Sequence, residues 1–263
     1  MGTFTLDVAG ASRAKGLVNE DAYLVDAPNL LFGVFDGLGA TTQAAEAAAL
    51  AADSIRAAYR EQRPGDDCDA ERTLLLRAVK GAGAAIAADL DDGLTTASVV
   101  KLCEQPDGRA TALIAHVGDS RVYQFAAVGE LRQCTLDDSM FGADWDLQLQ
   151  LGEVVGPTTM IEFAYFEQRH ILDRCLGSPG DDARLWETDV DDGDLLLALT
   201  DGVTDNLTFS EVREVISDGR ESADTIARRL VDAAYARSRD ESHARAKVDD
   251  ITAVVARVGR GGS

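Results

Sequence analysis

The sequence predicts an α+β fold in which antiparallel β-sheets lie in layers under covering helices. Two observations predict it: short β-rich runs are separated by turn signals, as in a meander of antiparallel strands, and two pairs of long helical segments are available to cover the sheets. With 263 residues, the chain is long enough for one large domain or two small ones. Because no linker and no repeat interrupts it, we predict one domain over residues 1–258 and a disordered tail over residues 259–263.

The predicted strands follow three patterns. The first strand alternates apolar and polar residues, two short apolar runs indicate buried strands, and the remaining runs are β-rich. In chain order, the predicted strands are residues 4–8, 30–35, 96–103, 110–117, 122–128, 195–200 and 251–258.

Four segments are predicted to be helices. The first is rich in alanine and lacks glycine and proline, so it should form a helix that packs closely against a sheet. The predicted helices are residues 41–60, 70–89, 209–217 and 223–239. Residues 62–69 carry loop signals, and residues 137–159 are expected at the surface with one short helix.

The chain is strongly acidic, with 46 acidic and 25 basic residues and a formal charge of −21. Such a surface repels nucleic-acid phosphates, which argues against DNA or RNA as partners. The surplus of carboxylates suits divalent cations, although an acidic surface also serves solubility. The basic and histidine residues are expected to be structural or solvated rather than functional. These residues are His116, His170, His243, Arg237, Arg239, Arg245 and Lys247.

The remaining composition predicts a cytoplasmic protein without membrane contact. No apolar run approaches the ~20 residues that cross a bilayer, and residues 1–10 show no secretory signal. The four cysteines, at positions 68, 103, 134 and 175, match no zinc pattern, so we expect them to be reduced thiols.

Acidic residues mark the ends of three apolar runs. Residues 31–35 lead into Asp36-Gly37, residues 195–200 lead into Asp201-Gly202, and Asp249-Asp250 precedes the closing strand. In an antiparallel sheet, the end of one strand lies beside the start of its neighbour, so these acids are expected to meet at one edge. A further acid, Asp119, lies between two predicted strands and is placed to join them.

Carboxylates packed in this way repel one another unless a cation neutralises them. Oxygen ligands without His or Cys select hard ions such as Mg²⁺, Mn²⁺ or Ca²⁺. Glycine after Asp36 and Asp201 allows a sharp turn and leaves a backbone carbonyl accessible as a further ligand. A single Asp-Gly pair at a strand end indicates only a turn, and spacing alone leaves the turn and the metal site both open.

Six short motifs, in order, resemble those of the PPM family, the metal-dependent type 2C Ser/Thr protein phosphatases, in the form typical of bacterial members. The motifs are Asn19-Glu20-Asp21-Ala22, residues 34–39, Thr95-Thr96-Ala97, residues 117–121, residues 199–205 and Asp249-Asp250-Ile251-Thr252. They span roughly residues 4 to 258. The resemblance implies a four-layer α-β-β-α sandwich of two antiparallel sheets flanked by helices, with two Mn²⁺ or Mg²⁺ ions at one end.

The resemblance also implies a role for each acid. Asp36 would bridge both ions, the Gly37 carbonyl would serve one of them, and Asp201 and Asp249 would complete the first site. The other implied contacts are indirect or weaker: Glu20 and Asp21 would act through metal-bound waters, and Asp119 would hold a third ion. Asp250 stands where the family usually has Asn, so whether Asp249 or Asp250 is the direct ligand stays open. Residues 137–159 would border the substrate entrance.

Two positions depart from the family pattern. Many members carry an arginine that grips the substrate phosphate where this chain has Gly16, and Arg13 or Lys15 would have to replace it. Some members carry a histidine where this chain has Leu38, so water would protonate the leaving group.

The predicted function is hydrolysis of phosphoserine and phosphothreonine in proteins, by direct attack of a metal-bridging hydroxide held by Asp36, Asp201 and Asp249. Its partners would be phosphorylated proteins, with a Ser/Thr kinase and its substrates among them, and the chain would act as a monomer. Two alternatives stay open: a catalytically weak regulatory or binding module with the same fold, and a Ca²⁺-binding structural protein. The absence of an EF-hand loop argues against the last of these.

Overall fold

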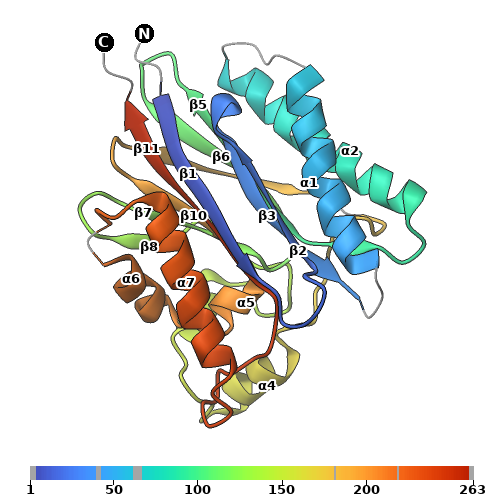
Figure 1. Cartoon of the computed structure of the whole chain (residues 1–263), viewed down its shortest axis with the longest axis vertical. Helices are drawn as coiled ribbons and strands as arrows, with labels where there is room; N and C mark the ends of the chain where they lie inside the picture. Colours follow the sequence, from blue (N-terminus) through green and yellow to red (C-terminus); the bar gives the residue numbers. More distant parts are fainter. Residues whose placement is uncertain (1–3, 40–42, 62–66, 181, 218, 261–263) are drawn as a thin grey trace.

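The computed structural model describes residues 4–39, 43–61, 67–180, 182–217 and 219–260. Two antiparallel sheets stack face to face, with α1 and α2 outside one sheet and α6 and α7 outside the other (Figure 1). The predicted four-layer α-β-β-α sandwich is therefore confirmed.

The strand order within each sheet mixes elements from both ends of the chain. One sheet has the order β1 (Phe4–Arg13), β11 (Ile251–Arg260), β10 (Leu195–Leu199), β7 (Arg121–Phe125) and β8 (Leu131–Gln133). The other has the order β2 (Asp21–Asp26), β3 (Leu31–Leu38), β5 (Ala97–Glu104), β6 (Ala110–Val117) and β9 (Arg184–Val190), and β4 (Leu94–Thr95) pairs with β3. The described helices are η1 (Ala27–Asn29), α1 (Gln43–Glu61), α2 (Cys68–Asp89), α3 (Trp145–Gly152), α4 (Met160–Gln168), α5 (Asp201–Thr204), α6 (Phe209–Ile216) and α7 (Ala223–Ser238).

The apolar run in β10 shows how the layers are held together. Leu196 and Ala198 belong to the core between the two sheets, whereas Leu195, Leu197 and Leu199 belong to the core under α6 and α7. A strand covered on both faces must be apolar at every position rather than at alternate ones. The sequence of β10 therefore fixes it as a central strand, and its C-terminal end carries Asp201 to the edge of the sandwich.

Several predicted boundaries need correction. Strand β11 continues through Gly259 to Arg260, which pairs with Phe4, so the tail predicted at residues 259–263 is wrong for its first two residues, and residues 261–263 lie outside the described part. The strand expected at residues 122–128 ends at Phe125, because Ala126 donates to the Glu130 carbonyl across a turn (2.8 Å).

The predicted helix and loop near the N-terminal half also shift. Residues 41–42 and 62–66 lie outside the described residues, and the helix after them begins at Cys68, earlier than predicted.

The start of the segment expected at the surface, residues 137–159, is buried: Asp137 accepts two hydrogen bonds from the Arg121 guanidinium, and Asp138 pairs with Arg174. The one short helix predicted there is α3; α4 follows after its end.

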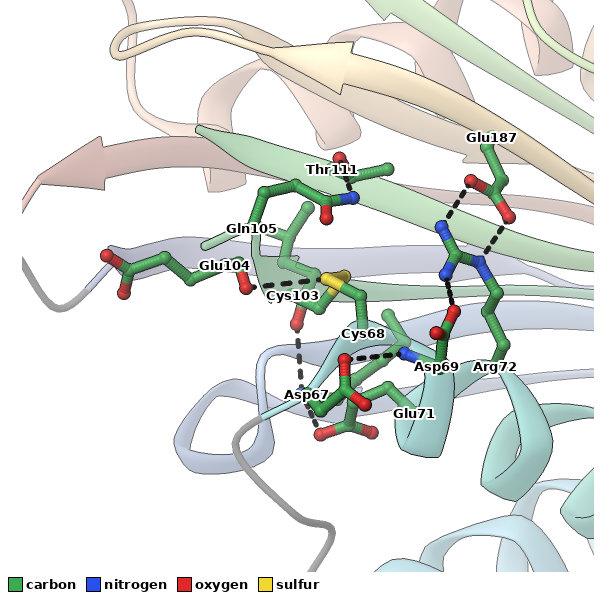
Figure 2. The surroundings of a disulfide bond; sticks show 12 residues. Asp67, Cys68, Asp69, Glu71, Arg72, Cys103, Glu104, Gln105, Thr111 and Glu187 are labelled. Atoms are coloured by element: carbon green, nitrogen blue, oxygen red, sulfur yellow. Dashed lines mark hydrogen bonds and ion pairs between the residues drawn. A yellow bond between two sulfur atoms is a disulfide. The ribbon is translucent and has the colours of Figure 1, made fainter. Parts of the chain in front are cut away.

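Two cysteines expected as reduced thiols form a disulfide. Cys68 at the start of α2 bonds Cys103 in β5, with 5.5 Å between their Cα atoms (Figure 2). Beside it, Arg72 of α2 donates two hydrogen bonds to Glu187 of β9, at 2.6 and 2.8 Å. These contacts fasten α2 to β5 and β9. Among the described helices, none is both long and apolar enough to cross a membrane.

Candidate metal centre

The acids predicted to meet lie at one end of the sandwich, but they come from two stacked sheets rather than from the edge of one sheet as predicted. Asp21 lies opposite Asp36 in the register of β2 and β3. In the other sheet, β10 ends beside the start of β11, where Thr200 donates from its backbone to the Thr252 carbonyl (3.0 Å). The Thr200 hydroxyl then donates to the Asp21 carboxylate (2.9 Å), which joins the acidic ends of the two sheets.

The carboxylates at this end of the sandwich raise one another's pKa values. Burial raises the pKa of Asp36 well above its usual range, and neighbouring carboxylates raise it further. The neighbours are Asp21, Asp201, Asp249 and Asp119. Burial likewise raises the pKa of Asp21 to about 8, against hydrogen bonds from Thr252 and Thr200 that lower it. The structure thus gathers Asp21, Asp36, Asp119, Asp201 and Asp249 into one acidic cluster.

Two lysine ammonium groups lie among these carboxylates. Lys247 contacts Asp201, Asp205 at 2.8 Å and Asp249 at 3.1 Å. Burial lowers the pKa of Lys247, but the three carboxylates outweigh burial and hold it well above its usual range, so the side chain is charged. Within the described ranges, no three His, Cys, Asp or Glu side chains close around a common point as a metal site would require.

The second ammonium belongs to a predicted substrate-binding residue. Lys15 contacts Glu20 at 2.6 Å, Asp249 at 3.4 Å and Asp250 at 3.6 Å. The other candidate, Arg13, turns toward α7, where its guanidinium lies 3.3 Å from the Tyr235 ring centre and 3.6 Å from Asp232. Of the two cations, Lys15 is therefore the one that contacts the acidic cluster.

The adjacent acids Asp249 and Asp250 have different surroundings. Asp250 is 2% exposed, and its two oxygens accept the backbone N–H groups of Lys15 (2.6 Å) and Glu20 (2.9 Å). It therefore fixes the loop between β1 and β2 against the start of β11. The Asp249 carboxylate is more exposed and contacts both ammonium groups.

The two glycines that follow Asp36 and Asp201 are required by close packing rather than by a turn with positive φ. A Cβ atom at Gly37 would lie 2.2 Å from the Ala44 carbonyl oxygen, and one at Gly202 would lie 1.8 Å from that of Asp250. A larger residue at either position would push apart the segments that carry the acids. Gly16, by contrast, has open space around it.

The expectation of a solvated basic cluster was wrong for two residues. Lys247 lies in the acidic cluster, and Arg245 is completely buried. Arg245 donates to the carbonyl oxygens of Thr204 and Val154, both at 2.7 Å, and so holds α5 in place. The only sequence signal for Lys247 is its position two residues before Asp249, which does not reveal where its side chain points.

The donor chemistry of the cluster fits hard divalent cations. All its ligating atoms would be oxygens, which Mg²⁺ and Mn²⁺ prefer. Among the described residues, one carboxylate oxygen each of Asp21 and Asp201 is buried without a hydrogen-bond partner. Buried polar atoms are normally satisfied, and these two unpaired carboxylate oxygens are available to a divalent cation.

Comparison with known proteins places this arrangement in a family. Residues 9–251 match the family model described as protein phosphatase 2C. A search of curated proteins found no significant match. Among solved structures, the catalytic domain of the serine/threonine protein phosphatase PstP, in complex with two manganese ions, is 26% identical, with 98% of this chain and 100% of that chain covered and a TM-score of 0.74.

Two further solved structures are similar over nearly their whole length. The serine/threonine phosphatase PstP/Ppp of Mycobacterium tuberculosis is 25% identical, with 96% of this chain and 98% of that chain covered and a TM-score of 0.74. The PPM Ser-Thr phosphatase MsPP of Mycobacterium smegmatis, in complex with cacodylate, is 27% identical, with 95% and 97% covered and a TM-score of 0.70. Together, the family match over most of the chain and the sandwich with acids at one end show that this protein belongs to the protein phosphatase 2C (PPM) family.

Proposed function

We propose that this chain is a metal-dependent phosphatase of phosphoserine and phosphothreonine in proteins. Its acidic cluster would hold two Mn²⁺ or Mg²⁺ ions through Asp36, Asp201 and Asp249, with the Gly37 carbonyl as a further ligand. The observation that carries the proposal is the pair of buried carboxylate oxygens, on Asp21 and Asp201, that have no hydrogen-bond partner within the described residues. The two manganese ions bound by the similar PstP catalytic domain support it.

The remaining acids would act around these ligands. Glu20 and Asp21 would orient water at the ions, and Asp119 would hold a third, weaker ion. Asp250 would keep the loop that carries Lys15 and Glu20 in place through its two backbone hydrogen bonds. When bound, divalent ions make water acidic enough to act as a nucleophile near neutral pH and offset negative charge on phosphoryl oxygens.

Lys15 is the better candidate for binding the substrate phosphate. Its ammonium is partly exposed and already lies against Glu20 and Asp249 at the rim of the cluster. A phosphate bound beside the acids would need such a cation to offset its charge. Arg13 is engaged with Tyr235 and Asp232 and would have to leave both to reach the phosphate.

A second candidate function is a regulatory module with weak catalysis. It is favoured by one observation: Lys247 and Lys15 already form ion pairs with carboxylates that would bind the ions. On this alternative the cluster would bind ions poorly, and the family fold would serve to recognise phosphoproteins.

Turnover measurements distinguish the two functions. We expect hydrolysis of p-nitrophenyl phosphate and of a phosphothreonine peptide with Mn²⁺ or Mg²⁺, and none with EDTA. Asp36→Asn and Asp201→Asn should each lower turnover at least a hundredfold, because a carboxamide is a poor ligand for a hard cation. Asp53→Asn, at an exposed acid on α1, serves as a matched control with full activity. Full turnover by both site variants would refute the proposed centre, and no turnover by the wild type would favour the weak module.

A further inference from the structure

Lys247 occupies an unusual position for a lysine. Its ammonium contacts Asp201, Asp205 and Asp249, which come from two separate segments of the chain. Asp201 and Asp249 both belong to the ligand set through which the proposed centre would hold an ion. The lysine charge therefore lies where that ion's charge would be needed.

The backbone of Lys247 is fixed so that the side chain is directed into the cluster. The buried Asn206 side chain accepts a hydrogen bond from the Lys247 backbone N–H (3.0 Å) and donates to its carbonyl (2.9 Å). Asn206 follows directly after α5 and Asp205, so the element that begins with Asp201 also anchors the lysine. Movement of the ammonium must therefore come from side-chain rotation, with the backbone held.

Asp205 offers the ammonium a second partner outside the proposed ligand set. It is 3% exposed, contacts Lys247 at 2.8 Å and also pairs with Arg169 at 3.4 Å. A lysine that gave up Asp201 and Asp249 would keep this ion pair. The Lys247 ammonium thus has one position against Asp201 and Asp249, where it competes with a divalent ion, and another against Asp205 alone, to which it can withdraw.

We propose that Lys247 is a built-in competitor for divalent ions, whose ammonium must leave Asp201 and Asp249 before an ion binds there. This inference rests on the proposed metal centre and deepens it. Lys247 is a positioning residue: without metal it neutralises the carboxylates, and it sets how tightly the ions are held. A purely structural ion pair would stabilise the fold without opposing metal binding.

The test is calorimetric titration of Mn²⁺ into protein freed of metal with EDTA. Lys247→Met removes the charge and keeps the length of the side chain, and we expect it to bind Mn²⁺ at least tenfold more tightly than the wild type. Lys247→Arg keeps the charge, so it should stay within about threefold of the wild type. Lys80→Met removes an ammonium that pairs with Asp182 on the outer surface and should change nothing.

A second measurement covers the case in which Lys247→Met does not fold without metal. Each variant is purified with Mn²⁺, and the rate of Mn²⁺ release into excess EDTA is followed. Release should be at least tenfold slower for Lys247→Met than for the wild type and for Lys247→Arg. Equal affinity and equal release for the wild type and Lys247→Met would overturn the inference while leaving the metal centre standing.

The other outcomes are also decisive. Equal tightening by Lys247→Met and Lys247→Arg would overturn the inference, because the charge would then not be the cause. Mn²⁺ binding by neither the wild type nor Lys247→Met would remove the proposed metal centre and this inference with it. Binding by Lys247→Met alone would support the inference in its strongest form.

Discussion

The burial of Asp21 predicts that the metal-free protein loses stability as the pH rises. Its pKa in the folded protein is about 8, against an ordinary value of 3.8, because burial disfavours the charged carboxylate. Between these two values the folded state keeps a proton that the unfolded chain has released. The free energy of unfolding therefore falls by about 1.4 kcal/mol per pH unit over this interval. Below pH 3.8 and above pH 8 this group adds no further slope.

The magnitude is large compared with the stability of a domain. Over the whole interval Asp21 alone would lower the free energy of unfolding by on the order of 5 kcal/mol. The total free energy of unfolding of a folded protein is only about 5–15 kcal/mol. Asp21→Asn removes the titration. Its side-chain oxygen still accepts a hydrogen bond, so the contact from the Thr200 hydroxyl can persist.

The assay is urea unfolding in EDTA, followed by circular dichroism at pH 5.5 and pH 8. Between pH 5.5 and pH 8, the free energy of unfolding of Asp21→Asn should rise by about 3 kcal/mol relative to that of the wild type. His116, whose pKa burial lowers, also titrates in this range, but the charged groups that act on it are Asp137, Asp138 and Arg184, so it contributes equally to both proteins. The exposed Asp53→Asn should follow the wild type. Parallel stability curves for the wild type and Asp21→Asn would refute the reasoning.

Two further predictions concern packing and cross-linking. Gly202→Ala places a Cβ atom 1.8 Å from the Asp250 carbonyl oxygen, so it should lower the free energy of unfolding in urea by about 1–3 kcal/mol and lower phosphatase turnover by separating Asp201 from β11. The control Gly81→Ala lies in open space on α2 and should lower neither. Equal behaviour of the two variants would contradict the packing argument. Replacing Cys68 and Cys103 by Ser opens a loop with a sequence separation of 35, so it should lower the free energy of unfolding by about 4 kcal/mol while turnover persists. An unchanged urea midpoint would argue against the disulfide.

The positions of the acids could be predicted from sequence because each depends on local information. An apolar run of five or six residues marks a strand, and an acid at its end is carried to the edge of the sheet. Antiparallel pairing then brings the end of β10 next to the start of β11, as observed at Thr200 and Thr252. Strand ends and pairing rules were enough to bring Asp201 and Asp249 together, whereas Asp36 lies on β3 in the other sheet and meets them because the two sheets stack.

Contacts that depend on packing between distant segments could not be predicted. Cys68 and Cys103 are 35 residues apart, and only the placement of α2 on β5 brings their sulfur atoms together. Arg245 was expected in solvent because the basic cluster that contains it lies among acidic residues in the sequence, yet α5 and the residues before α4 surround it. Hydrophobic periodicity describes which face of an element is buried, and it gives no information on a charged side chain that enters a polar interior.

The position of Lys247 could not be predicted from the sequence either, and its positive charge offsets part of the negative charge of the acidic cluster. The cluster is neutralised in two ways without metal: Asp21, whose pKa burial raises to about 8, retains its proton at neutral pH, and Lys247 and Lys15 supply positive charge. On the proposed function, a divalent ion would have to replace both, since metal ligands bind as carboxylates and not as acids. Metal affinity in this chain would then depend on its protons and lysines as much as on the ligands themselves. A family motif identifies the ligands, whereas the competing charges are visible only in the folded structure.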